Sequence, residues 1–469
     1  MAARSFAVLM LVVAVLPAAA QGPAKPIALH PDNPHYLLWR GKPTVLITSG
    51  EHYGAVLNGE FDYVRYLDEL KRCGLNLTRT FSGTYCENPQ AFNITHNTLA
   101  PAEGKFLSPW VRSDTPGYIN GGNKFDLTKF APAYFTRLKD FLAQASKRGV
   151  VVELVLFCPM YNEDMWKRSP MNVINNVNGI GQLKRTEPLT LNNGKLLEVQ
   201  LALVRKVVTE CNEFDNLYYE ICNEPYFGGV TLEWQHKVAE CIVETEKSLP
   251  DRHLIAQNIA NKGAKIKDPH PAVSIFNFHY ATPPTTVADN WQLNRVLGDD
   301  ETGFKGTADW HYHMEAWEFL LAGGAIYSNL DYSFTAAQPD GTFFPLPAKQ
   351  PGGGGRDLRA QLKILKDFIE SFDFVRMSPD KSVVVAGVPD KGAAWCLAEK
   401  GKAYAIYVRG AGPAKLVLDI PPGRYKAQWL NTWTGKIDKS QALDHKGGKA
   451  TLESPAFKQD VALRMVRSQ

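Results

Sequence analysis

The sequence predicts an α/β protein that consists of a (β/α)8 TIM barrel and a small all-β sandwich domain after it. Three observations lead to this fold class. Between residues 44 and 372, short apolar runs alternate with longer amphipathic stretches, as in a parallel sheet with crossover helices. Eight such units can be counted. Beyond Pro379 the chain changes to short β-rich runs separated by turn residues, a pattern typical of a β-sandwich.

The eight runs that we expect to form the barrel strands are short and mostly apolar. They are residues 44–49, 75–81, 150–157, 217–222, 253–257, 274–279, 295–298 and 325–329. Six amphipathic stretches have the spacing of helices. They are residues 62–73, 134–148, 198–211, 232–247, 308–321 and 357–372. Gly74 and Gly149 follow the first two, as is usual where a helix ends.

The length of the chain indicates two domains, because 469 residues exceed the roughly 250–300 residues over which one core usually extends. We expect the barrel over residues 21–375 and the sandwich over residues 380–469. Two connections, residues 82–131 and 158–194, are long enough to form walls of a substrate cleft. The glycine run at 352–355 is interpreted as a mobile loop.

The composition is that of a globular protein, since 45% of the residues are hydrophobic and 21% are charged. The net charge is only +4, and no run of Lys and Arg could follow a phosphate backbone, so we expect no nucleic acid partner. The seven cysteines are odd in number and widely scattered. We expect them to be mainly buried free thiols, with one or two disulfides left open.

The first 20 residues have the form of a cleavable secretory signal. Arg4 precedes an apolar run at 7–16, which is followed by Pro17 and three alanines at 18–20. Cleavage near Ala20 would give a secreted or periplasmic protein. No other segment approaches the about 20 apolar residues that a membrane span needs. The first cysteine is Cys73, which disfavours a lipid anchor after the apolar run.

Two of the predicted strands lead into a glutamate. The fourth, residues 217–222, is followed by Asn223 and Glu224, and the seventh leads to Glu301. Catalytic groups of such barrels lie at the C-terminal ends of the strands, and strands 4 and 7 face each other across the lumen. Hydrolysis of a glycosidic bond needs two such carboxyls, one to protonate the departing oxygen and one to attack the anomeric carbon. Asp299 and Asp300 remain alternatives to Glu301.

This order of strands and motifs resembles glycoside hydrolase clan A, in particular family 5-like cellulases and related exported bacterial glycosidases. The resemblance extends over roughly residues 30 to 375. It implies that Glu224 is the general acid/base, that Glu301 is the nucleophile, and that Asn223 binds the 2-hydroxyl of the substrate. The sandwich is also similar to the small domain appended to many exported glycosidases.

The same resemblance assigns three further residues to the substrate-binding site, next to the nucleophile. Arg79, at the end of the motif at 74–79, looks like the strand-2 arginine that keeps the nucleophile ionised. His279 and Tyr280 are similar to the strand-6 pair, whose tyrosine also contacts the nucleophile. A carboxylate at Glu301 beside a guanidinium and a phenol is physically consistent with that role.

The end of the eighth strand departs from the clan pattern. The clan often has a tryptophan there, on the floor of the subsite, whereas this chain has Tyr327, Asp331 and Tyr332. Tyr327 and Tyr332 are candidates to replace this platform, and Asp331 is a candidate to bind sugar hydroxyls in a pocket.

Further candidates for substrate binding lie near the end of the first strand and in the cleft walls. They are His52, Tyr53, Trp110 and Trp166. Trp291 and Trp310 are also candidate sugar platforms, although packing accounts for most tryptophans. His311 and His313 are too few for a zinc site, which needs three or four ligands, so no metal is expected.

We therefore expect an exported retaining glycoside hydrolase. Its partner is a poly- or oligosaccharide substrate, in which it cleaves a β-glycosidic bond by double displacement without metal or organic cofactor. Two alternatives remain, a catalytically inactive barrel that binds carbohydrate and a transglycosylase that uses the same residues.

Overall fold

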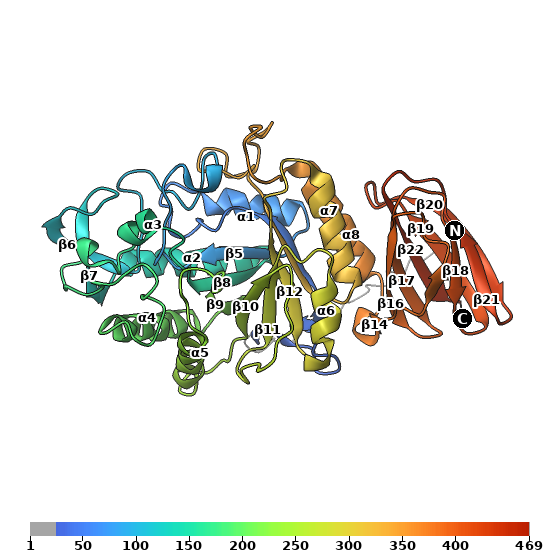
Figure 1. Ribbon diagram of the computed structural model, residues 1–469, viewed down its shortest axis with the longest axis horizontal. Helices are drawn as coiled ribbons and strands as arrows, with labels where there is room; N and C mark the ends of the chain where they lie inside the picture. The colour runs from blue at the N-terminus through green and yellow to red at the C-terminus, as the bar shows by residue number, and fades with distance from the viewer. Residues whose placement is uncertain (1–24, 469) are drawn as a thin grey trace, which may run out of the picture.

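The computed structural model describes residues 25–468, so the predicted signal sequence lies outside the described residues. It consists of an eight-stranded parallel barrel surrounded by helices, followed by antiparallel sheets (Figure 1). The sheets lie at one end of the long axis of the molecule, next to α7 and α8. The predicted fold class is confirmed.

The barrel strands are largely buried and follow one another around the barrel in chain order. They are β4 (Leu46–Gly50), β5 (Leu77–Phe81), β8 (Val151–Phe157), β9 (Leu217–Cys222), β10 (Ile255–Asn261), β11 (Ile275–His279), β12 (Val296–Thr302) and β13 (Ile326–Leu330). The ladder of paired strands begins at β4 and ends at β5. Between these two, the Asn76 amide donates to the Val45 carbonyl at 2.8 Å and accepts from the Ile47 N–H at 2.9 Å. This side chain links the two edges of the barrel.

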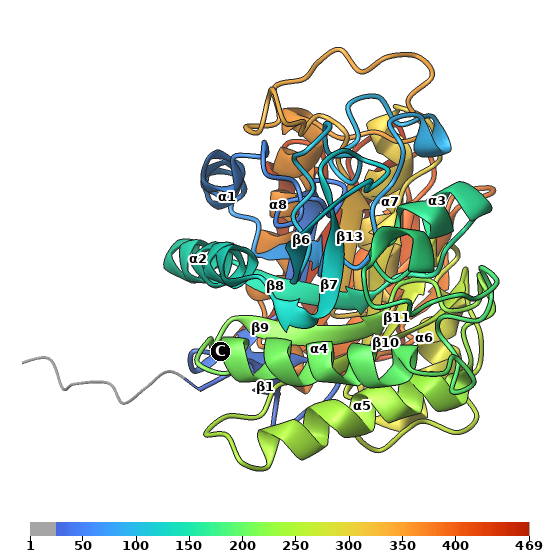
Figure 2. The same ribbon diagram turned by 90° about the vertical axis from the view of Figure 1, so that its left-hand side faces the viewer.

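Eight α-helices and four short 3-10 helices accompany the strands in the described part of the chain. They are α1 (Tyr63–Arg72), α2 (Pro132–Arg148), α3 (Glu163–Arg168), α4 (Leu196–Cys211), α5 (Leu232–Glu246), α6 (Thr285–Asn290), α7 (Asp309–Leu321) and α8 (Arg356–Glu370), with η1 (Ala91–Asn93), η2 (Val173–Asn175), η3 (Trp291–Leu293) and η4 (Phe374–Arg376). Six of the α-helices match the predicted stretches. The other two, α3 and α6, have six residues each, which is too short for a periodic pattern. Figure 2 shows α4 and α5 side by side outside the barrel.

Two small sheets complete the barrel domain. One precedes the barrel and contains β1 (Ala28–Leu29), β2 (Leu37–Trp39) and β3 (Lys42–Thr44). The other is a hairpin of β6 (Trp110–Pro116) and β7 (Asn123–Phe130) inside the first long connection. That connection was predicted only as a cleft wall, without these two strands.

The glycine run at 352–355 is a packed segment, so the interpretation as a mobile loop is wrong. All four glycines are buried. A Cβ on Gly353 would lie 2.7 Å from the Tyr312 ring, and one on Gly354, whose φ is 129°, would lie 2.1 Å from an Asp331 oxygen. The glycines are required because the backbone passes directly against these side chains.

The C-terminal strands form two antiparallel sheets with a separate hydrophobic core. The six-stranded sheet contains β14 (Ser378–Pro379), β16 (Ala393–Glu399), β17 (Ala403–Arg409), β22 (Asp460–Arg467), β19 (Gly423–Leu430) and β20 (Ile437–His445), and the three-stranded sheet contains β15 (Val384–Ala386), β18 (Lys415–Asp419) and β21 (Lys449–Glu453). The larger sheet packs on α7 through two polar contacts. Arg409 Nε lies 2.5 Å from Glu318 Oε1, and His313 Nε2 lies 2.7 Å from Asp460 Oδ2.

All seven cysteines are free and buried, as expected for thiols that pack as small apolar groups. Between residues 25 and 468, no helix combines the length and the apolar character that crossing a bilayer requires.

Candidate active site

A cavity of about 550 Å³ lies at the C-terminal ends of the barrel strands. Both predicted acids, Glu224 and Glu301, line it. The other lining side chains are mostly aromatic, with a few polar groups between them. They include His52, Tyr53, Glu87, Phe92, Tyr161, Asn223, Phe227, Lys262, Tyr280, Phe304 and Lys305. An apolar cavity with few convergent polar groups is the usual form of a small-molecule site.

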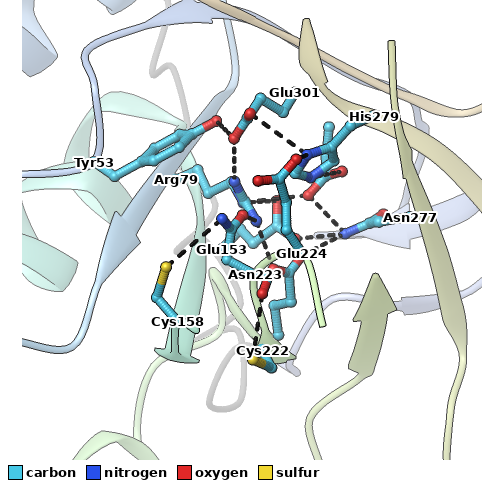
Figure 3. Close-up of polar contacts among 12 residues, drawn as sticks. Tyr53, Arg79, Glu153, Cys158, Cys222, Asn223, Glu224, Asn277, His279 and Glu301 are labelled. Atoms are coloured by element: carbon cyan, nitrogen blue, oxygen red, sulfur yellow. Dashed lines mark hydrogen bonds and ion pairs between the residues drawn. The ribbon is translucent and has the colours of Figure 1, made fainter. Parts of the chain in front are cut away.

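Glu301, at the end of β12, is surrounded by hydrogen-bond donors (Figure 3). The hydroxyl of Tyr53 donates to Oε2 at 2.8 Å and that of Tyr280 to Oε1 at 2.7 Å. Arg79 Nη1 also donates to Oε2, at 3.2 Å. Burial alone would raise the pKa of Glu301, but the charge and hydrogen bond of His279, together with Arg79, hold it well below its usual range. Glu301 is therefore a carboxylate at neutral pH.

Glu224 lies just after β9 and has different neighbours. Its Oε2 accepts a 2.6 Å hydrogen bond from the Tyr161 hydroxyl, and its Oε1 accepts one from Tyr226 at 3.2 Å. The backbone of Glu224 has φ of 35°, and those of Tyr53 and Tyr280 have φ of 60° and 55°. Such left-handed conformations cost about 1–3 kcal/mol in non-glycine residues and gather at functional sites.

His279 lies behind the two acids. Its Nδ1 is 3.2 Å from Glu224 Oε1 and 3.5 Å from Glu301 Oε1. A carboxylate oxygen of each glutamate and a ring nitrogen of His279 lie within 4.8 Å of one another. Burial alone would lower the pKa of His279, but the charge of Glu301 and the hydrogen bonds to Glu224 and Glu301 raise it well above its usual value. The imidazolium therefore holds both acids on one side of the cavity.

Arg79, on β5, is fully buried beneath the cavity floor. Besides Glu301, its guanidinium contacts Glu220 Oε1 at 2.5 Å and Asp300 Oδ2 at 3.2 Å. Its Nη2 donates to Asn223 Oδ1 at 2.7 Å. The arginine thus fixes the residue that precedes Glu224 as well as Glu301 itself.

Three carboxyl groups, those of Glu153, Glu220 and Asp300, form a cluster around this guanidinium. The Asn277 amide nitrogen lies 2.7 to 2.9 Å from an oxygen of each. Burial, then the neighbouring carboxyls, raise the pKa of Glu153 well above its usual value, and burial also raises that of Asp300. For Glu220, burial acts in the same direction but Arg79 outweighs it and lowers the pKa.

These shifts give a balanced interior at neutral pH. The cations Arg79 and His279 stand against the carboxylates of Glu220 and Glu301, while Glu153 and Asp300 keep their protons. Buried charges are retained only when they are paired and hydrogen-bonded in this way. This network keeps the charge of Glu301 in place.

The structure brings together most of the predicted site residues, in two groups. His52, Tyr53, Asn223 and Tyr280 line the cavity with the two acids. Arg79 and His279 were also expected to contact substrate. They are only 2% and 0% exposed and do not line the cavity. They are positioning residues that act through Glu224 and Glu301.

Trp110, Trp166 and Tyr332 were predicted to bind substrate, and the structure places none of them on the cavity. Trp110 is 1% exposed in the β6–β7 hairpin. Trp166 donates its indole N–H to the Leu183 carbonyl at 3.0 Å, and Tyr332 packs against the ring of His52 with centroids 5.8 Å apart. Long connections often bury their aromatic side chains in small cores of their own. This explains why these three rings pack inward and do not face the substrate cavity.

The other strand-8 candidates are also occupied within the fold. The hydroxyl of Tyr327 donates to the Tyr312 carbonyl at 2.7 Å. Asp331 forms a fully buried 2.6 Å ion pair with Arg359 and accepts from Ser49 at 3.0 Å. No oxygen of Asp331 faces the cavity, because these partners take up the carboxylate.

Several functional residues were missed by the sequence analysis. Tyr161 and Tyr226 bond Glu224 from loops after β8 and β9, where nothing in the spacing gives their direction. A signal did exist for Glu153 and Glu220, because each interrupts an otherwise apolar strand. A charge in the middle of a buried strand indicates a paired or functional group.

Two groups have the spacing of metal ligands, Glu224 with His279 and Glu301, and Glu153 with Glu220 and Asp300. In the second group Arg79 already supplies the positive charge. In the first, the oxygens of both glutamates already accept hydrogen bonds from tyrosines. His313 is paired with Asp460 at the sheet contact, so the His311/His313 motif has a structural use.

No family model and no curated protein sequence matches the chain. Solved structures do share its fold. A candidate glycoside hydrolase from Bacteroides vulgatus has a TM-score of 0.65 at 14% identity, covering 97% of this chain and 84% of that one. A glycoside hydrolase family 5 protein from the same organism has a TM-score of 0.62 at 14% identity, covering 94% and 93%. A further glycoside hydrolase has a TM-score of 0.61 at 14% identity, covering 95% and 97%. The predicted resemblance is confirmed at the level of the fold.

Proposed function

We propose that this chain, which shares the fold of family 5-like glycoside hydrolases, is itself a retaining glycosidase. It cleaves a β-glycosidic bond in a poly- or oligosaccharide, with Glu301 as nucleophile and Glu224 as general acid/base. The observation that carries the proposal is the pairing of these two acids on one cavity, within 4.8 Å, in different surroundings. The carboxyls of retaining glycosidases are about 5–5.5 Å apart, whereas inverting enzymes need about 6.5–9.5 Å for a water.

In the first step, a Glu301 oxygen forms a bond to the anomeric carbon as the glycosidic C–O bond breaks. Glu224 gives its proton to the departing oxygen. In the second step, Glu224 takes a proton from a water molecule, whose oxygen attacks the anomeric carbon and releases Glu301. Protons and bonds balance over the two steps, and no cofactor is needed.

The surroundings of each glutamate support its role. Arg79, His279 and two tyrosines stabilise a carboxylate at Glu301, which is the form that attacks. Tyr161 places an oxygen of Glu224 by a 2.6 Å hydrogen bond, and Asn223 in turn donates to that hydroxyl at 2.8 Å. Asp299 and Asp300, the alternatives to Glu301, are fully buried and do not line the cavity.

The shape of the cavity supports cleavage at a chain end. Phe92, after β5, and Phe304, after β12, both line it, and their ring centroids are 6.2 Å apart. These loops therefore approach each other although β13 and β4 separate their strands. A site narrowed in this way accommodates the end of a glycan more readily than its middle. Export of the protein is part of the proposal and rests on residues 1–20 of the sequence alone.

The test is a screen of the wild type and Glu301→Ala against plant and microbial polysaccharides and aryl glycosides, with the released sugars separated by chromatography. Cleavage by the wild type alone is expected, with the configuration of the first product retained. Wild-type rates in Glu301→Ala would contradict the assignment of the nucleophile. Sugar transfer to added acceptors in preference to water would indicate a transglycosylase. A wild type that binds glycans but cleaves none would indicate an inactive barrel.

A further inference from the structure

A second cavity, of about 530 Å³, lies where the barrel meets the C-terminal sheets. It is formed by the start of α7, the connection between β13 and α8, and one residue from the loop after β19. Trp310, Phe344 and Trp433 supply aromatic surfaces to it. Phe344 is 71% exposed, so its ring is accessible from solvent at the rim of this cavity.

The indole of Trp433 is held in place before any ligand arrives. Its Nε1 donates to Asp460 Oδ1 at 2.9 Å. Its ring stacks on His313 with centroids 4.6 Å apart and planes 17° apart, and lies nearly parallel to Trp310, with centroids 6.1 Å apart. Asp460 also accepts from His313, so the two rings share one anchor. A fixed aromatic face needs little ordering on binding.

Polar groups surround these rings. Asp309, at the start of α7, and Asp357, at the start of α8, both line the cavity, as does Thr342. Within residues 25–468, no hydrogen bond or ion pair joins either carboxyl to another side chain. Part-exposed aromatic faces beside carboxyls with unused acceptor sites match a sugar ring, which has an apolar C–H face and hydroxyls at its edge.

The two cavities are neighbours along the chain. Gly303, Phe304 and Lys305 line the catalytic cavity, and Thr307, Asp309 and Trp310 line the second one. One short segment after β12 therefore forms a wall of each. Because β12 carries Glu301 at its end, a glycan held in the second cavity lies close to the proposed reaction site.

We propose that the cavity formed by Trp310, Phe344 and Trp433 is a second carbohydrate-binding site, which takes another part of the polysaccharide that the catalytic cavity cleaves. This inference rests on the proposed function for the identity of the ligand. It gives the C-terminal sheets a role, since they supply Trp433 and its anchor Asp460. The site holds the polymer near the catalytic cavity and leaves small substrates unaffected.

The first experiment measures binding without cleavage. Glu301→Gln and Glu301→Gln/Trp310→Ala/Phe344→Ala are run in native gels containing soluble β-glucan, galactomannan, xylan or carboxymethylcellulose. At least one polysaccharide is expected to retard the first protein, and the two further substitutions are expected to weaken its apparent affinity about tenfold. Ile437→Ala, which removes an exposed apolar side chain from β20, is the control in the same background and should change nothing.

The second experiment uses the active enzyme. In Trp310→Ala/Phe344→Ala, kcat/KM for the polysaccharide is expected to fall about tenfold while kcat/KM for an aryl glycoside stays unchanged. An equal fall on both substrates, or retardation that the substitutions leave intact, would overturn the second site. The absence of retardation by all four polysaccharides would also overturn it. Thermal stabilisation by choline that depends on Trp310 would indicate a cation site instead of a carbohydrate site. If the wild type cleaves nothing yet is retarded through Trp310 and Phe344, the proposed function fails and the second site stands.

Discussion

The hydroxyl of Tyr280 donates a 2.7 Å hydrogen bond to Oε1 of Glu301, and this bond links the end of β11 to the end of β12. Tyr280 directly follows β11, whose last residue His279 pairs with Glu301 of β12, so the distance between Tyr280 and Glu301 is set by the barrel. A hydrogen bond to a charged group contributes about 1.5–3 kcal/mol. Tyr280 is therefore expected to matter for the ionisation of Glu301 as well as for its position.

Replacement of Tyr280 by Phe should lower kcat/KM about tenfold or more and shift the acidic limb of its pH profile upward. The sign follows from the pKa of Glu301, which its neighbours hold low. With one donor removed, that pKa rises and the carboxylate is lost at a higher pH. The measurement is kcat/KM for an aryl glycoside against pH.

Tyr332→Phe is the matched control for this variant. The Tyr332 hydroxyl is buried near the same site but has no hydrogen-bond partner among the residues that the structure describes. Its removal should leave the pH profile in place. An acidic limb that moves equally in both variants, or in neither, would contradict the role of Tyr280.

Glu224→Ala should slow hydrolysis of natural glycosides by about 10²- to 10⁴-fold, because their leaving groups need a proton from the general acid. Aryl glycosides with acidic leaving groups need no proton, so the first step should survive on them. Rates are compared on one natural and one activated substrate. Glu233→Ala, an exposed glutamate on α5, serves as the control. Equal loss on both substrates would argue against the acid role.

Arg79→Met should destabilise the fold by about 3–5 kcal/mol at pH 7, since it leaves buried carboxylates without their cation. The pKa values of Glu220 and Glu301 are lowered in the folded protein. Their contribution to folding stability is therefore present above the ordinary pKa of 4.5 and is lost as the pH falls through the lowered pKa. Without Arg79 both pKa values rise, so the loss of stability in Arg79→Met should become smaller as the pH falls. Denaturant unfolding from pH 4 to 8 measures it, with the exposed Arg205→Met as control. A deficit that does not depend on pH would contradict the charge balance.

The barrel could be predicted because each strand is a short apolar run that ends at a change in character. Glu224 and Glu301 could be placed because the fold dictates where strand ends meet, so two residues 77 positions apart in the sequence share one cavity. The resemblance to clan A, and not strand geometry, placed Arg79 and Tyr280 beside Glu301. It could not distinguish a residue behind the acids from one facing the substrate, as His279 illustrates.

The long connections were beyond such reasoning. Nothing in the spacing of Trp110 or Trp166 tells whether an indole faces a cavity or a small core, and both pack inward. Tyr161 lies in the same connection as Trp166, residues 158–194, but its hydroxyl donates to Glu224 in the cavity. Side-chain direction in irregular backbone depends on tertiary packing, whereas in a strand it follows from the period of two.

The protonated ring of His279 gives a pH dependence opposite in sign to that of Glu301. Its pKa is raised, so its contribution to stability is fully present below its ordinary value of 6.5 and is lost as the pH rises through the raised value. The free energy of unfolding of the wild type should therefore exceed that of His279→Gln by at least about 1 kcal/mol near pH 6. The difference should shrink as the pH rises above 6.5 toward the raised pKa of His279. Guanidinium unfolding at several pH values checks this, and a difference that grows with pH would contradict a charged His279.

Removal of metal ions should leave the activity unchanged. Glu224, His279 and Glu301 are close enough to bind a cation, but the oxygens of both glutamates already accept hydrogen bonds from tyrosine hydroxyls, and Arg79 and His279 supply positive charge beside them. A metal ion would have to displace these donors and approach two cations. The lost hydrogen bonds and the charge repulsion would outweigh its attraction to the two carboxylates. Wild-type enzyme dialysed against EDTA should keep its kcat and KM. Activity that is lost on chelation and restored by Zn²⁺ or Mn²⁺ would contradict hydrolysis by the two carboxyls alone and would make Glu224, His279 and Glu301 a metal site.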